Sequence, residues 1–219
     1  MNTDPAWQAE EWVQGRISEI IPDALLELPW PEHQRLGSAK LVEPLYHGDG
    51  SAGLGGLYAA VNAIRLVIAQ RRLLSEREAD DLFEAGLIFL ECHRSLAACW
   101  SRGIRFQLWS RMVAALSRIA EKRFDLPVVV EQPFRGARTV TRDQTFRILE
   151  ALVVRQRPSV IMRRGGTFAV ITGYTPHSLL LSDSHGARSI RREACGVAMN
   201  PNRARHRLCP WSITTFWSV

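Results

Sequence analysis

Serine and histidine are among the few residues of this sequence that could support nucleophilic chemistry. Ser51 precedes a stretch that opens with glycines and reads as a helix, and the expected topology could bring His47, His177 or His185 near it. A serine acts as a nucleophile only when a base lies within about 3 Å of its hydroxyl group. A hydrolase with such a relocated nucleophile is one candidate function.

Four cysteines offer a second set of reactive groups. Arginines near a thiol favour the thiolate, and His206 stands three residues before Cys209, but that spacing within a strand does not by itself create a catalytic pair. No CxxC pair occurs, and the spacings supply no tetrahedral ligand set. We therefore expect buried thiols, no metal site and no cofactor; the cysteines are Cys92, Cys99, Cys195 and Cys209.

The elements that must position these residues follow from hydrophobic periodicity and turn residues. Helical spacing predicts helices over residues 4–25, 55–70, 75–100, 105–123 and 142–155. Short apolar runs bounded by turn residues predict a buried strand within 125–133 and antiparallel strands over 159–163, 166–174, 178–184 and 187–193. The last segment, 206–219, alternates enough to predict an edge strand.

This order predicts an α+β fold in which a mainly helical N-terminal lobe precedes an antiparallel β-sheet or half-barrel lobe. We divide the chain into an N-terminal helical arm and loop at 1–50, a helical lobe at 51–125, and a β lobe with one helix at 126–219, the whole forming a single two-lobed domain. A chain of 219 residues is long enough to give both lobes a core.

The segment GGLYAAVNAIRL, residues 55–66, resembles the nucleophile helix of papain-like cysteine peptidases, above all the compact bacterial C39-like type. Gly55 stands at the position of the family's cysteine, and Gly56 matches the glycine that follows it. Asn62 and Arg65 fit the same helical pattern. The resemblance implies a papain-like fold.

A second segment, RRGGTFAVITGYTPHSLLLSDSHG, resembles the strands that carry the family's histidine and its orienting carboxylate. Thr167 stands at the histidine position, and Asp183 stands where the orienting Asp or Asn belongs. The family's upstream glutamine is missing, since this stretch supplies His47 and Asp49 instead. Of these catalytic positions, only the third member is retained.

The resemblance therefore implies a pseudo-peptidase. Glycine offers no atom for a helix dipole to activate, and threonine cannot serve as the imidazole base. The cleft between the lobes would instead bind a peptide, a protein tail or a partner subunit through backbone hydrogen bonds and apolar subsites. We expect Gly53, Gly56, Tyr58 and Phe168 to line it, with four tryptophans as candidate anchors: Trp100, Trp109, Trp211 and Trp217.

The charge distribution supports an alternative function in nucleic-acid binding. Residues 151–219 contain two acidic and ten basic residues, whereas residues 1–50 contain nine acidic and three basic ones. All basic residues except Lys40 and Lys122 are arginines, which suit bidentate contact with phosphate or carboxylate. The arginines expected at adjoining hairpin ends, where they would form a basic surface, are Arg163, Arg164, Arg191 and Arg192.

The location and assembly of the chain follow from its apolar patterning. No apolar run approaches the ~20 residues that span a bilayer, and no signal-peptide pattern opens the chain. We therefore expect a cytoplasmic protein without a membrane partner. The acidic arm carries Trp7 and Trp12 and could dock onto another subunit, in a homo- or hetero-oligomer, or fold back onto its own basic lobe.

Overall fold

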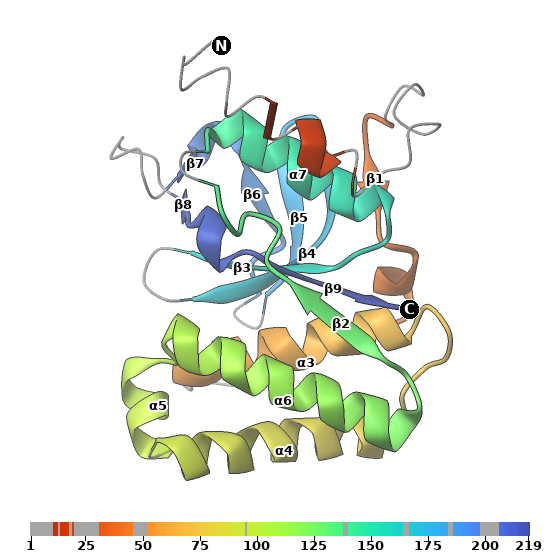
Figure 1. Ribbon diagram of the computed structural model, residues 1–219, viewed down its shortest axis with the longest axis vertical. Helices are drawn as coiled ribbons and strands as arrows, with labels where there is room; N and C mark the ends of the chain where they lie inside the picture. Colours follow the sequence, from red (N-terminus) through yellow and green to blue (C-terminus); the bar gives the residue numbers. More distant parts are fainter. Residues whose placement is uncertain are drawn as a thin grey trace.

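The computed structural model describes residues 11–12, 14–17, 19, 31–45, 52–94, 96–137, 140–163, 167–183, 186–197 and 206–219. Helices occupy most of the first half of this part of the chain, and nearly all of the strands lie in the second half. One antiparallel sheet lies between the helix of residues 142–154 on one side and a helical layer on the other (Figure 1). The prediction of a mixed fold with an antiparallel sheet is confirmed.

The central helix of the molecule is α3, Gly55–Ile68, which follows a short 3-10 turn, η2, at Ala52–Leu54. Nearly all of its side chains are apolar and buried. A helix that is apolar on every side must be covered on every side. Accordingly, α3 packs on strands of the sheet with one face and on two other helices with the opposite face (Figure 1).

Two helices result from the stretch that we predicted as one helix over 75–100. Helix α4, Glu76–His93, begins at a capping box between Ser75 and Glu78, as predicted. It ends at Arg94, whose backbone is extended, and α5, Leu96–Arg102, then starts with its first N–H donated to the Glu91 carboxylate at 2.6 Å. The carboxylate of the first helix thus caps the second, which stabilises the break.

Helix α6, Phe106–Phe124, closes the helical layer, and Asp125 in the left-handed conformation ends it. α6 contacts α3, α4 and strand β2, Val128–Glu131, whereas α4 lies outermost, against α3 and α6. On the other face of the sheet, α7, Arg142–Val154, starts at a second capping box formed by Thr141 and Gln144 (Figure 1).

The sheet has the strand order β2-β9-β3-β4-β5-β6, and every neighbouring pair in it is antiparallel. A two-residue strand, β1 at Gln34–Arg35, pairs with the end of β4. Two further strands, β7 at Cys195–Val197 and β8 at His206–Leu208, form a separate parallel pair. The remaining strands are β3 at Ser159–Met162, β4 at Phe168–Thr175, β5 at Ser178–Ser182, β6 at Ser189–Arg191 and β9 at Thr214–Ser218.

Three expectations about the strands are wrong. The C-terminal strand β9 is internal, between β2 and β3, and its Phe216 is fully buried. The strand expected to be buried, β2, is instead an edge strand with only Val128 buried. The loop expected at the end of the arm contains Gln34 and Arg35, which extend the sheet beside β4. Strand pairing depends on segments far apart in the sequence, which local patterns do not specify.

The described part of the N-terminal arm packs on its own chain. Residues 14–17 are helical. Arg16 pairs with the Glu131 carboxylate and donates from Nε to the carbonyl of Pro133 at 3.2 Å, and the ring of Trp12 lies 6.1 Å from that of Phe134. The described arm residues thus contact the β2 edge and the turn after it, and docking of the arm onto another subunit stays a prediction; Trp7 lies outside the described residues. None of the described helices combines the length and the apolar character needed to cross a bilayer.

Candidate functional site

The fold brings together the two segments that carry the resemblance. Gly55 is the first residue of α3, and the next residue, Gly56, faces Phe168 at the start of β4. A Cβ built on Gly56 would lie 3.1 Å from the Phe168 ring and 2.9 Å from that of Trp109. The beginning of the central helix therefore meets the strand end that carries Thr167.

Glycine is required at two positions around this junction because neighbouring atoms approach closely. A Cβ on Gly53 would lie 2.0 Å from the carbonyl oxygen of Trp100 and 2.3 Å from that of Cys99. The carbonyl of Gly56 accepts a hydrogen bond of 2.7 Å from the buried indole N–H of Trp109. These contacts fix η2 and the start of α3 against α5 and α6.

A cavity of about 500 Å³ opens beside this junction, and both Gly53 and Thr167 border it. Trp100 borders it with 51% of its surface exposed. Arg102 and Arg105 are also exposed. We call this space the α3–β4 cavity; its lining residues are Gly53, Trp100, Ser101, Arg102, Gly103, Ile104, Arg105, Phe106, Met162 and Thr167.

Next to the cavity lies a buried ion pair. The side chain of Asp183, at the end of β5, is completely buried, and its Oδ2 lies 2.5 Å from the guanidinium of Arg163, whose side chain is 12% exposed. The backbone N–H of Arg163 donates to the carbonyl of Thr167 at 2.8 Å. The carboxylate that would orient a histidine at position 167 thus binds the guanidinium of a neighbouring residue instead.

Asn62 and Arg65, the other matches of the helical pattern, hold the chain segment that leads toward the helix. The Asn62 side chain accepts from the backbone N–H of Leu45 at 2.9 Å and donates to its carbonyl at 3.3 Å. Arg65 donates to the carbonyl of Glu43 at 2.9 Å, and burial lowers the pKa of its guanidinium. Both residues therefore hold the backbone of residues 43–45 against α3.

The four residues expected to line the cleft are not all accessible. Gly53 borders the α3–β4 cavity. Gly56 and Phe168 are buried beneath Trp109, and Tyr58 packs its ring 4.7 Å from that of Phe83 on the side facing α4. Helical geometry explains the error: successive residues of α3 point in different directions, so one segment serves both the sheet and the helices.

Of the tryptophans proposed as anchors, Trp100 alone lines the cavity. Trp109 is fully buried, and Trp211, 38% exposed, donates to the carbonyl of Ala137. Trp217 lies under the guanidinium of Arg157, 4.4 Å from the ring centre. Arg102 and Arg105 were not predicted as site residues, although two arginines that flank a glycine between two helices could have indicated a basic turn.

The expected basic surface is also wrong in composition. Arg163 is only 12% exposed and pairs with Asp183. Arg192 pairs with Glu150 and packs over the Phe146 ring, 4.6 Å from its centre, and burial raises the pKa of the Glu150 carboxyl despite that pairing. Arg191 is exposed, at the end of β6. The β3–β4 connection, which follows Arg163, lies at the opposite end of the sheet. Arg164 lies outside the described residues, so the structure yields no common surface of these arginines.

The relocated nucleophiles gain no support where they are described. Ser51, His47 and His185 lie outside the described residues. His177 follows β4, an eight-residue strand that spans about 26 Å, and therefore lies at the end opposite Thr167. Desolvation raises the pKa of Cys195 to about 11, which opposes a thiolate.

The cysteines differ in exposure more than we expected. Cys99 and Cys195 are buried as predicted, but Cys92 is exposed and Cys209 is half-buried. Burial raises the pKa of the Cys99 thiol. Among the residues that the structure describes, no group of three His, Cys, Asp or Glu side chains could hold a metal ion.

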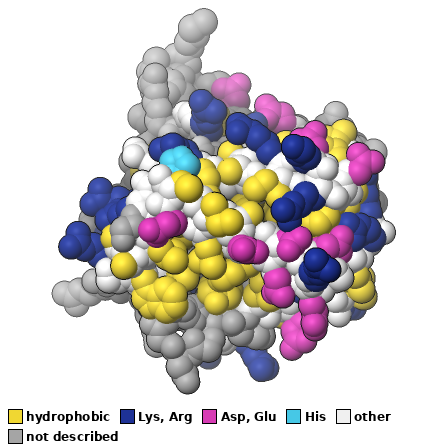
Figure 2. Space-filling view, turned by 90° about the horizontal axis from the view of Figure 1, so that it is seen from below, with side chains coloured by type: hydrophobic (Ala, Val, Ile, Leu, Met, Phe, Trp, Pro, Cys, Tyr) yellow, Lys and Arg dark blue, Asp and Glu magenta, His cyan; other side chains and the backbone are white. Residues whose placement is uncertain are grey.

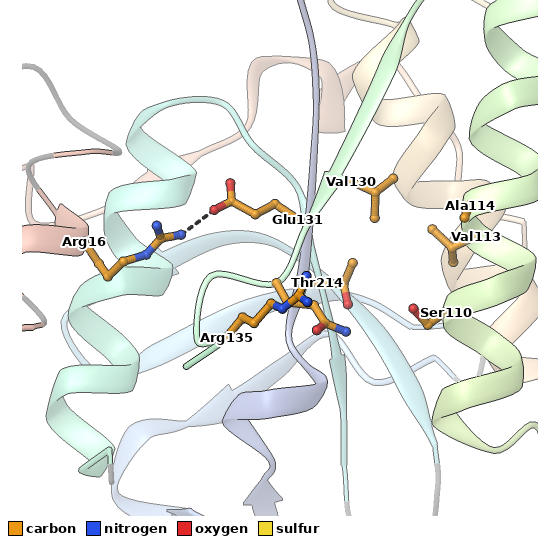
Figure 3. Close-up of a pocket in the computed structure, with 9 residues that line it drawn as sticks. Arg16, Ser110, Val113, Ala114, Val130, Glu131, Arg135 and Thr214 are labelled. Atoms are coloured by element: carbon orange, nitrogen blue, oxygen red, sulfur yellow. Dashed lines mark hydrogen bonds and ion pairs between the residues drawn. The ribbon is translucent and has the colours of Figure 1, made fainter. Parts of the chain in front are cut away.

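A second cavity, of about 520 Å³, lies between α6 and the β2 edge (Figure 3). Arg16 reaches toward Glu131 across one side, while Ser110, Val113 and Ala114 of α6 face it from the other (Figure 3). Arg16 and Glu131 already pair with each other, so this contact holds the arm to the sheet.

The comparisons with known proteins give no match: no family model, no curated protein and no solved structure is significantly similar to the chain.

Proposed function

We propose that this chain is a papain-like pseudo-peptidase whose α3–β4 cavity binds a peptide segment of a partner protein without cleaving it. The observation that carries this proposal is that the two resembling segments meet, through Gly56 and Phe168, beside one accessible cavity. Gly53 and Thr167 border the same space, and the glycine that follows the nucleophile position packs on the residue that follows the histidine position. A peptide-binding cleft in this family would lie at that junction.

The absence of hydrolysis follows from the side chains at these positions. Gly55 has no nucleophilic atom, Thr167 has no basic nitrogen, and the carboxylate of Asp183 is engaged by Arg163. A nucleophile and its base act as a unit, so the loss of both removes the chemistry rather than weakening it. Peptide binding needs neither group, because it uses backbone hydrogen bonds and apolar contacts.

The direct test is partner capture with a cavity-filling variant and a matched control. Thr167→Trp would place an indole at the cavity border, while Thr175→Trp would place the same side chain at the opposite end of β4, where the native threonine is also partly exposed. A partner that binds the wild-type chain and the Thr175→Trp variant, but not the Thr167→Trp variant, supports the proposal. A partner retained equally by both variants contradicts it.

A second test addresses catalysis. In the folded Cys92→Ser variant, serine- and thiol-reactive peptidase probes should label no residue that borders the cavity. Intact-mass spectrometry measures the labelling. The Cys92→Ser background removes the exposed thiol that would react for reasons unrelated to catalysis. Stoichiometric labelling of one residue at the cavity would show that a relocated nucleophile exists.

A further inference from the structure

We propose that the α3–β4 cavity selects an acidic peptide segment that carries a large apolar side chain. This inference rests on the proposed function and names the class of peptide. It starts from the charges at the cavity. Arg102 and Arg105 border the cavity and are exposed, and none of the described lining residues is acidic.

Several other arginines of the described chain form ion pairs with carboxylates. Arg163 and Arg192 pair with Asp183 and Glu150, and Arg123 pairs with Asp81 at 2.9 Å. Arg102 and Arg105, in contrast, form no ion pair within the part of the chain that the structure describes. Their charges are therefore available to a ligand carboxylate, and guanidinium groups bind carboxylates in bidentate fashion.

The backbone adds charge of the same sign. Helix α6 begins at Phe106 with Arg105 as its N-cap residue, and no side chain caps its first turn. The positive end of the helix dipole therefore faces the same border of the cavity as the two guanidinium groups. This contribution strengthens the preference for an anion that the arginines establish.

The apolar requirement follows from the remaining lining residues. Trp100 is half exposed, Ile104 is buried, and Phe106 and Met162 are partly buried around the same space. Apolar side chains gather on the face that carries α4 and α5, toward the side where α5 lies in Figure 1, and both acidic and basic side chains lie around them (Figure 2). A ligand that covered Trp100 with a large apolar group would remove both surfaces from water.

The size of the charge preference follows from exposed ion pairs, which contribute weakly one by one. Arg102 and Arg105 can form two ion pairs with an acidic peptide and would repel a basic one. These effects together should make the affinity for the acidic peptide roughly tenfold or more higher than that for the basic peptide at low salt. Screening at high salt should narrow the difference, because the arginines are exposed.

The experiment uses three fluorescein-labelled peptides that share a central Phe and differ only in their flanks: Asp-Glu-Phe-Asp-Glu, Ser-Gln-Phe-Ser-Gln and Lys-Arg-Phe-Lys-Arg. Binding to the full chain is measured by fluorescence anisotropy at about 0.02 M and about 0.5 M NaCl. We expect the acidic peptide to bind at least about tenfold more tightly than the basic one at low salt, and the difference to shrink at high salt.

Variants assign the binding to the cavity. Arg102→Glu combined with Arg105→Glu should reverse the charge preference, whereas Arg111→Glu, at an exposed position of α6 that does not line the cavity, should leave the order unchanged. Trp100→Ala should weaken all binding, and Trp211→Ala should not. Far-ultraviolet circular dichroism checks that each variant is folded.

The outcomes separate this inference from the proposed function. Equal affinities for the three peptides, all lost in the Trp100→Ala variant, would overturn the acidic preference and leave the peptide-binding cavity standing. No binding of any peptide would overturn both. Displacement of the acidic peptide by a short single-stranded oligonucleotide, through the same arginines and Trp100, would replace the peptide with nucleic acid as the ligand.

Discussion

Replacing Arg163 by methionine should destabilise the protein far more than the loss of an ordinary surface ion pair. The Asp183 side chain is completely buried and Arg163 is 12% exposed, so the variant leaves a carboxylate in the interior without its cation. Removing one partner of a buried pair costs about 3–5 kcal/mol. The slight exposure of Arg163 favours the lower end of this range, and we expect a loss of about 3 kcal/mol in the free energy of unfolding.

A double-mutant cycle measured by urea unfolding tests this reasoning. Asp183→Asn removes the buried charge and leaves the partly exposed guanidinium, so it should cost less than Arg163→Met. The double variant should be no less stable than Arg163→Met alone, since no buried charge remains uncompensated.

The matched control is Arg123→Met, because Arg123 and Asp81 form a pair whose side chains are 53% and 41% exposed. Such pairs contribute less than about 1 kcal/mol. If Arg163→Met were no more destabilising than Arg123→Met, the Asp183 carboxylate would have to be compensated by other means, and the argument from burial would be refuted.

Three further predictions concern the stability at acid pH, the reactivity of the thiols, and the two positions that align with the cysteine and histidine of papain-like peptidases. Hydrogen bonds from Arg72 lower the pKa of Glu78 to about 2. The carboxylate therefore contributes fully to the free energy of unfolding above about pH 4.5, and this contribution is lost as the pH falls toward 2. Glu78→Ala should reduce the fall of the free energy of unfolding at acid pH by less than about 1 kcal/mol, because the group is near the surface. Iodoacetamide at about pH 8 should label Cys92 in the native protein, while Cys195, with a pKa raised to about 11, should react only after unfolding, as peptide mass mapping would reveal. In a Cys92→Ser background, the double variant Gly55→Cys, Thr167→His should gain a reactive thiol that neither single substitution gives. If the Gly55→Cys single variant reacted equally well, position 167 would not face position 55.

The sequence was a good guide to elements whose signals are local. The capping box at Ser75 and the glycines that open α3 predicted helix starts that the structure contains. Turn residues between apolar runs similarly predicted the β3–β4 and β4–β5 connections. These signals act within a few residues of one another, so no knowledge of the tertiary structure is needed to read them.

Features that depend on distant partners were missed. Nothing near β9 indicates that β2 and β3 flank it on both sides. Arg163 reads as one of many arginines until β5 brings Asp183, twenty residues away, within hydrogen-bond distance. Trp100 is exposed and Trp109 is buried. This difference in burial depends on how α5 and α6 meet, and the helical pattern of either segment does not determine that.

Arg163 also gives a physical reason for the side chain at position 167 under the proposed relation to papain-like peptidases. A buried carboxylate must be compensated by a cation or by donors, and in a peptidase the imidazole fills that role. With threonine at the histidine position, Asp183 would be a liability unless another group replaced the imidazole. Arg163 is suited to do so, because its backbone pairs with Thr167 and its side chain reaches Asp183. Under this proposal, the Asp183 carboxylate holds the β3–β4 end beside the cavity in place, and its presence has a structural reason that does not depend on catalysis.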